Sequence, residues 1–175
     1  MELYLFRHGI AEDAPPSQSD SLRKLTPEGR ERTAAVARMA CSAGVEPSMI
    51  ASSPYVRAVQ TAEIAAREFG WKGELLRLPS LVPHGTPEEV WSDIRALRHE
   101  PSLLLAGHEP LLGNLTGYLL NAPGLMTDMK KSAMVRLDLA SFGSAPRGIL
   151  RWMIVPKLTP PALSEPSGVS NEGRR

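Results

Sequence analysis

The chain has 175 residues, of which 42% are hydrophobic and 22% are charged, a balance typical of one globular domain. Its 20 basic and 19 acidic side chains leave a net charge of +1, which excludes a strongly basic nucleic-acid binder. A single cysteine excludes an internal disulfide, and without an apolar run of membrane-spanning length or a signal-peptide core we expect a cytoplasmic protein that contacts no membrane.

The first half of the chain alternates between short apolar runs and amphipathic stretches. Residues 3–6 are apolar on both faces, as in a buried parallel strand, and residues 12–21 form a polar surface loop. Residues 26–44 then combine a threonine N-cap, a proline at the first helical position and a closing glycine, which predict a helix. Residues 49–51 and 53–70 repeat this order of strand and helix.

The middle of the chain continues the alternation. Residues 75–78 predict a short strand, and residues 87–97 predict a helix that starts at a proline. Residues 103–106 form another wholly apolar strand, and residues 110–119 predict a helix with leucines on its inner face. Strands that alternate with helices predict an α/β domain with a mostly parallel sheet.

The last part of the chain lacks this alternation. Residues 134–139 and 149–155 predict two strands joined by a connection that contains glycine and proline but no helix, so we expect them to pair antiparallel. The domain is therefore predicted to span residues 1–155. Residues 156–175 contain four prolines followed by serine, glycine and charged residues, a composition typical of a disordered tail outside the core.

Three polar motifs each follow a predicted parallel strand. They are the Arg-His-Gly motif at residues 7–9, the Ser-Ser-Pro motif at residues 52–54 with Arg57 beyond it, and the Gly-His-Glu-Pro motif at residues 107–110. The carboxyl ends of parallel strands lie at one edge of an open α/β sheet, where such sheets bind ligands. We therefore expect these motifs to converge on one site.

The side chains that converge there are suited to an anion. Arg7 and Arg57 carry permanent charge, and the guanidinium fork matches phosphate oxygens. His8 and His108 add two imidazoles, and Gly9 lets the backbone approach closely after the strand. Because Arg57 lies in the first turn of its predicted helix, the helix amino end adds positive potential at the same place.

His8 has a second potential role in this setting. Neutral imidazole is a competent nucleophile toward phosphorus, and neighbouring arginines disfavour the imidazolium form. The hypothesis is phosphoryl transfer to His8 and hydrolysis of the phosphoenzyme by water, with Arg7, Arg57 and His108 stabilising the charge on the transferred group. One ring nitrogen must then face phosphorus while an acceptor holds the other, and the sequence leaves open which nitrogen does which.

These motifs resemble those of the histidine phosphatase superfamily, also called the phosphoglycerate-mutase-like family. The resemblance covers the chain to Val155 and includes features of the SixA-type phosphohistidine phosphatases, namely small size and a Leu-Thr-Pro-Glu-Gly start to the first helix. The matching segments are residues 5–9, 25–29, 52–62 and 107–110.

The resemblance implies a three-layer α/β/α sandwich, whose sheet is mostly parallel with a late antiparallel strand. It also implies that His8 is the phosphorylated nucleophile, that Arg7, Arg57 and His108 complete the phosphate pocket, and that neither a metal nor another cofactor is needed.

The chain departs from two branches of this family in its acidic residues. The mutase branch carries a proton-donating glutamate after the second helix, whereas residues 80–85 here contain no acid, which disfavours a mutase. The acid-phosphatase branch places an aspartate directly after its second histidine, where this chain has Glu109. Glu109 is therefore a candidate general acid, although a cap at the start of the next helix is an equally good interpretation.

These observations favour a metal-independent phosphohistidine phosphatase that acts on a partner protein, such as a phosphotransfer domain. A P–N bond to imidazole needs less leaving-group protonation than a P–O bond to an alcohol, so this activity tolerates a missing proton donor. One alternative is a broad-specificity metabolite phosphomonoesterase, which would need an acid such as Glu109. An alternative of another class is a phosphate-binding interaction module without turnover. The sequence does not determine the oligomeric state.

Overall fold

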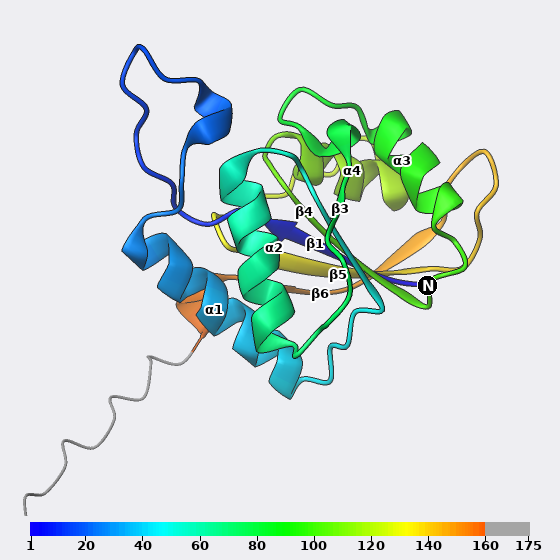
Figure 1. The fold of residues 1–175 in the computed structure, drawn as a ribbon. Coiled ribbons are helices and arrows are strands. Elements are labelled where there is room, and N and C mark those ends of the chain that lie inside the picture. The colour runs from blue at the N-terminus through cyan, green and yellow to red at the C-terminus, as the bar shows by residue number, and fades with distance from the viewer. Residues whose placement is uncertain (160–175) are drawn as a thin grey trace, which may run out of the picture.

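The computed structural model describes residues 1–159, which form one sheet covered by helices on both faces (Figure 1). The sheet has six strands in the order β3-β2-β4-β1-β5-β6. The strands are β1 (Glu2–Arg7), β2 (Met49–Ser52), β3 (Leu76–Arg77), β4 (Ser102–Gly107), β5 (Met134–Leu139) and β6 (Gly148–Ile154).

The four strands β3, β2, β4 and β1 run parallel, β5 runs antiparallel to β1, and β6 runs antiparallel to β5. The predictions of a mostly parallel sheet and of an antiparallel late pair are thus confirmed. A parallel pair needs a crossover between its strands, and helices supply it, whereas β5 and β6 are joined without one.

Helices flank the sheet in two layers. The α-helices are α1 (Pro27–Ser42), α2 (Val56–Glu68), α3 (Pro87–Ala96) and α4 (Leu111–Leu119), and the short 3-10 helices are η1 (Asp20–Leu22), η2 (Pro79–Leu81) and η3 (Pro156–Leu158). Helices α1 and α2 pack on one face of the sheet and α3 and α4 on the other (Figure 1). This is the predicted three-layer α/β/α sandwich.

The strand β1 shows why its sequence is apolar throughout. Leu3 and Leu5 point into the core shared with α3 and α4, while Tyr4 and Phe6 point into the core shared with α1 and α2. All four side chains are fully buried because successive residues of a strand face opposite sides of the sheet.

The register of the sheet aligns the ends of its central strands. Arg7 of β1 pairs with Gly107 of β4, and Ser52 of β2 pairs with Ala106 of β4. The three polar motifs therefore leave the sheet at the same edge. The amino end of β5 reaches this edge as well, since Met134 pairs with Phe6.

The described chain continues past the last strand. Helix η3 lies beside α1, so residues 156–159 of the predicted tail have a defined conformation there (Figure 1). The rest of the predicted tail, residues 160–175, lies outside the described residues. Among residues 1–159, no helix has the length and apolar composition needed to cross a membrane.

Candidate active site

His8 leaves the end of β1 with its backbone held on two sides. Its N–H donates to the Gly107 carbonyl of β4 at 2.9 Å, and its own carbonyl accepts from the Ser132 N–H, before β5, at 3.1 Å. The residue is 8% exposed. The backbone therefore fixes the position of the imidazole at the edge of the sheet.

The His8 ring has a defined tautomer. Its Nδ1 lies 2.7 Å from the Gly9 carbonyl oxygen. Because a carbonyl only accepts hydrogen bonds, Nδ1 must carry the proton and donate. Nε2 lies 3.3 Å from Nε of Arg57, which donates to it. The neutral ring thus presents its Nε2 lone pair to the cationic side of the pocket, which resolves the question that the sequence left open.

The surroundings of His8 also keep it uncharged. Burial lowers the pKa of the imidazole to about 3, and the charges of Arg57, Arg7 and Lys131 act in the same direction. The hydrogen bond to Gly9 opposes this shift without reversing it. His8 is therefore neutral, and nucleophilic, throughout the physiological range of pH.

Gly9 and Thr61 connect the end of β1 to α2. The Gly9 N–H donates to the Thr61 hydroxyl at 3.2 Å, and that hydroxyl donates to the Arg57 carbonyl at 2.8 Å. A Cβ on Gly9 would lie 2.6 Å from Oγ1 of Thr33 and 2.8 Å from the Gly29 carbonyl oxygen. Only glycine fits there, and Thr61 links the backbone of Gly9 to that of Arg57.

Arg57 projects from the first turn of α2 and is 4% exposed. Its terminal nitrogens donate to the Asp20 backbone oxygen at 2.7 Å and to Oδ2 of Asp20 at 2.9 Å. The guanidinium carbon lies 5.1 Å from the centre of the Tyr55 ring. These contacts direct Nε of Arg57 toward His8.

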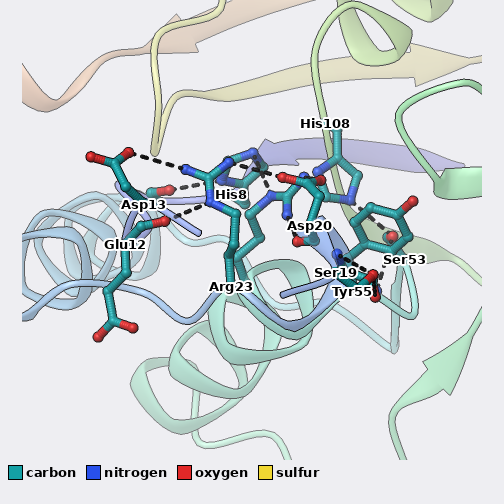
Figure 2. A network of polar contacts seen from close by, with 12 residues as sticks. His8, Glu12, Asp13, Ser19, Asp20, Arg23, Ser53, Tyr55 and His108 are labelled. Atoms are coloured by element: carbon teal, nitrogen blue, oxygen red, sulfur yellow. Dashed lines mark hydrogen bonds and ion pairs between the residues drawn. The ribbon is translucent and has the colours of Figure 1, made fainter. Parts of the chain in front are cut away.

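Asp20 is a site residue that the sequence did not reveal. It lies on η1, within the stretch that reads only as a polar surface loop, and Nη1 of Arg23 donates to its Oδ1 at 3.0 Å (Figure 2). Hydrogen bonds from Arg23 and Arg57 hold the pKa of Asp20 below its usual value. The N-cap serine Ser19 signals a turn here, but nothing in the sequence pairs this turn with α2.

His108 follows β4 and faces His8 across the pocket (Figure 2). The two ring centres are 4.9 Å apart, and Nε2 of His108 lies 2.9 Å from the Ser53 hydroxyl. Within residues 1–159 its buried Nδ1 has no partner. Burial lowers the pKa of His108 to about 2, and the positive charges of Arg57 and Arg7 add to the effect.

The sequence suggests that Ser53 caps a helix beginning directly after it, but α2 begins only at Val56, and its N-cap residue Tyr55 makes no side-chain capping bond. The Ser53 hydroxyl instead accepts from the Tyr55 N–H at 3.3 Å, within the turn before the helix. The same hydroxyl contacts His108, which the sequence did not indicate.

Arg7 completes the cluster: one terminal nitrogen donates to the Met129 carbonyl, and its buried Nε has no partner in the described part of the chain. The structure thus brings Arg7, His8, Arg57 and His108 together.

Comparisons with known proteins agree with this geometry. Residues 3–81 match the model of the histidine phosphatase superfamily, branch 1. The phosphohistidine phosphatase SixA of Escherichia coli (strain K12) is 31% identical over 159 residues, which cover 89% of this chain and 94% of the relative. The chain belongs to the histidine phosphatase superfamily. An uncharacterised protein of Picosynechococcus is 36% identical over 141 residues, which cover 78% of this chain and 84% of that protein.

The fold of this histidine phosphatase is also found in a solved SixA structure. The protein histidine phosphatase SixA complexed with tungstate superposes with a TM-score of 0.80 at 29% identity, covering 90% of this chain and 98% of the other. The chain is therefore a SixA-type member of the superfamily and a phosphatase, as the resemblance predicted.

Glu109 occupies a different place in this phosphatase from the four clustered residues. Its Oε2 accepts from the Gly113 N–H, in the first turn of α4, at 3.3 Å, so the carboxylate contributes to capping that helix. Its Oε1 is buried and has no partner within residues 1–159, and burial raises the pKa of the carboxyl. The general-acid role of Glu109 remains a prediction.

A metal site does not emerge from the donor groups of the described residues. Within residues 1–159, no three side chains of histidine, cysteine, aspartate or glutamate are grouped to hold a metal ion. The independence from metals that the resemblance implies remains a prediction.

Proposed function

We propose that this phosphatase hydrolyses phosphohistidine on a partner protein in the cytoplasm, such as a phosphotransfer domain, through a covalent phospho-His8 intermediate. The observation that carries this proposal is the orientation of the His8 ring. Gly9 holds the protonated Nδ1, and the Nε2 lone pair faces the guanidinium of Arg57. Nucleophilic catalysis at phosphorus requires this arrangement of a neutral imidazole beside fixed positive charge.

In the first step, the Nε2 lone pair attacks phosphorus and the P–N bond of the substrate breaks. The electron pair of that bond leaves with the substrate imidazole. Arg7 and Arg57 donate to the phosphoryl oxygens, and His108 donates through its otherwise unpartnered Nδ1. This last role follows if the Ser53 hydroxyl, which already accepts from Tyr55, gives its proton to Nε2 of His108.

In the second step, water attacks phosphorus, the bond from phosphorus to Nε2 breaks, and inorganic phosphate leaves. The electron pair returns to Nε2, which restores the starting enzyme. The Gly9 carbonyl keeps the proton on Nδ1 throughout. Because the phosphorylated ring then carries a positive charge, its imidazole is a good leaving group for hydrolysis.

Two features support a phosphohistidine rather than an ester as the substrate. The relative from Escherichia coli is itself a phosphohistidine phosphatase, and the solved SixA structure is that of a protein histidine phosphatase. In addition, Asp20 is the carboxylate that contacts Arg57, and its lowered pKa makes it a poor proton donor. Departure of an alcohol needs such a donor more than departure of imidazole does.

One observation favours a second candidate, a metabolite phosphomonoesterase. Burial raises the pKa of Glu109, which increases the protonated fraction near neutral pH and suits a general acid. The residue directly follows His108 in the chain, and its carboxyl is close enough to Arg7 for their charges to interact.

Phosphate release from two substrates tests the proposal. One is a histidine-phosphorylated phosphotransfer domain and the other is p-nitrophenyl phosphate, both assayed with a chelator present. We expect rapid release from the protein, slow release from the ester, and loss of both by at least about 100-fold in His8→Ala. The chelator should have no effect.

The variant Glu109→Gln separates the two candidates. We expect it to release phosphate from the phosphoprotein at about the rate of the unaltered enzyme. Fast ester hydrolysis that drops roughly 10- to 100-fold in Glu109→Gln, with the phosphoprotein untouched, would establish the metabolite phosphatase instead. Tight binding of the phosphoprotein without release would favour an interaction module.

A further inference from the structure

A cleft of about 660 Å³ opens beside the catalytic pocket at the same edge of the sheet. Four parts of the chain form it: the end of β1 with the residues that follow it, the first half of α1, the loop before β5, and the segment that runs from β6 into η3. Arg7 lines this cleft and also belongs to the catalytic cluster, so the two spaces adjoin. We call it the basic cleft because its charged lining residues are Arg7, Arg32, Lys130, Lys131, Lys157 and Asp128.

The lining of this cleft carries an excess of positive charge that the chain as a whole does not have. Five basic side chains face one acidic side chain, although the whole chain has a net charge of only +1. Asp128 forms an ion pair with Lys130 at 2.5 Å. Lys131 and Lys157 form no ion pair with any side chain of residues 1–159. Arg32 also pairs with Glu28, which is not part of the cleft lining. The positive potential of the cleft is thus compensated only in part by the described residues, and the charges of Lys131 and Lys157 contribute most of what remains.

The basic cleft is close enough to the catalytic pocket to act with it. Besides sharing Arg7, it contains Lys131, whose charge contributes to the lowered pKa of His8. Any negatively charged group that entered the cleft would lie next to the position of the transferred phosphoryl group. A substrate that fills both spaces is therefore favoured if it carries anionic groups beyond the phosphoryl group itself.

The uncharged residues that line the cleft indicate which kind of molecule it can bind. Ile10, Val155 and Pro156 give it an aliphatic wall, and they are all partly exposed. A polypeptide segment with acidic and aliphatic side chains matches both the wall and the charges. The size of the cleft, several times that of a phosphate ion, also suits side chains of a protein.

We propose that the basic cleft is the docking site for an acidic segment of the protein that carries the phosphohistidine. This inference rests on the proposed function, which supplies the protein substrate. The cleft would attract the acidic segment, set the orientation of the partner, and so deliver its phosphohistidine to His8. Electrostatic guidance of this kind acts mainly on the rate of productive encounter.

The test compares Lys157→Glu with a matched control in the full-length chain. Lys157 is exposed in η3 and touches no catalytic residue in the described network, so its replacement alters the charge of the cleft alone. The control is Lys72→Glu, which makes the same change of charge at an exposed residue between α2 and β3, at the opposite edge of the sheet. Thermal unfolding would verify that both variants fold.

Each variant is assayed on a histidine-phosphorylated phosphotransfer domain that is acidic around its phosphohistidine, and on free phosphohistidine. We expect Lys157→Glu to lower kcat/KM for the protein roughly five- to tenfold and to leave free phosphohistidine unchanged. Lys72→Glu should affect neither substrate. Added salt should lower kcat/KM for the protein more in the unaltered enzyme than in Lys157→Glu.

Other outcomes overturn the docking site. No change with the protein means that the partner docks elsewhere, and an equal fall with both substrates means that the cleft serves small anions. A rise with both substrates means that a segment of this chain, such as residues 160–175, occupies the cleft. If the unaltered enzyme hydrolyses esters but not the phosphoprotein, the proposed function fails, and the docking site fails with it.

Discussion

His8 and His108 remain uncharged in the middle of a cationic cluster, and this determines the chemistry of the site. Their ring centres are 4.9 Å apart, and Arg57 lies against His8. Burial and the neighbouring positive charges both disfavour protonation, so the cationic form of either ring is costly. The pocket thus supplies fixed charge from its arginines for the phosphate and, on neutral His8, an Nε2 lone pair for the attack, which accepts from Nε of Arg57 until a phosphoryl group takes that place.

An NMR titration of the imidazole nitrogens of the free enzyme tests this description. With the pKa of His8 at about 3, its ring should remain neutral from about pH 7.5 to about pH 5, with the proton on Nδ1 throughout. A chemical-shift change with a midpoint near the usual histidine value of about 6.5 would contradict it. So would a spectrum that places the proton on Nε2.

The sequence predicted the four clustered residues because each of their motifs follows a parallel strand. Arg7, His8 and His108 leave the sheet at strand ends, and Arg57 sits one helical turn beyond another strand end, so their meeting follows from topology. Asp20 could not be predicted in this way. Its contact with Arg57 depends on the path of a loop, and no periodicity in the sequence encodes that path.

At the scale of elements, the site depends on how closely α1 approaches the chain after β1. Gly29, in the first turn of α1, lies against the backbone of Ile10, and a Cβ there would come within 2.1 Å of the Ile10 carbonyl oxygen. Thr26 caps the same turn by accepting from the Gly29 N–H at 3.0 Å. Helix α1 therefore packs directly on the segment that continues from the Arg-His-Gly motif.

The variant Gly29→Ala should measure this packing. Alanine gains up to about 1 kcal/mol in helix propensity, but overpacking against a rigid backbone costs about 1–3 kcal/mol, and here we expect the upper end. The free energy of unfolding should fall by roughly 2 kcal/mol in a denaturant titration, with lower turnover. In the control Gly124→Ala, the added Cβ meets no atom within 4 Å, so the change should be within about 0.5 kcal/mol. Equal stability of the two variants would contradict the close approach.

The elements themselves were largely predictable, because caps and apolar periodicity are local signals. Helix α3 begins at Pro87 as expected, with Thr86 and Glu89 forming a capping box. The strand order was not predictable, since it depends on which apolar strands pair across the sheet. The strand predicted at residues 75–78 is only two residues long in the structure, where it forms β3. This strand is the outermost one of its side of the sheet, so it has β2 as a neighbour on one side and no strand of residues 1–159 on the other.

For the molecule as a whole, the two buried histidines link stability to pH. In the unfolded chain their pKa is about 6.5, whereas burial lowers it to about 3 for His8 and about 2 for His108. Below about pH 6.5 the unfolded chain therefore binds protons that the folded protein does not. Stability falls as the pH decreases through this window, and the raised pKa of Glu109 opposes the fall in part.

Comparison of His8→Gln with the unaltered protein isolates the contribution of His8 to the pH dependence of stability. Each buried histidine should lower the free energy of unfolding by roughly 2 kcal/mol when the pH falls from about 7 to about 5. Over this range, the free energy of unfolding of His8→Gln should therefore fall by about 2 kcal/mol less than that of the unaltered protein. Denaturant titrations at the two pH values measure the difference. The exposed His84 provides the control, because His84→Gln should keep the full pH dependence. Identical pH dependence in all three proteins would show that His8 is not buried in its neutral form.

The most direct measurement is the location of the phosphoryl group on the enzyme during turnover. A rapidly quenched reaction with a phosphorylated phosphotransfer domain, followed by peptide mapping and ³¹P NMR, distinguishes the residue and the ring nitrogen that carry it. The hydrogen bond from Nδ1 to Gly9 predicts a single phosphorylated site, on Nε2 of His8. Turnover with the phosphoryl group on Nδ1, on another residue, or on no residue of the enzyme would contradict the account.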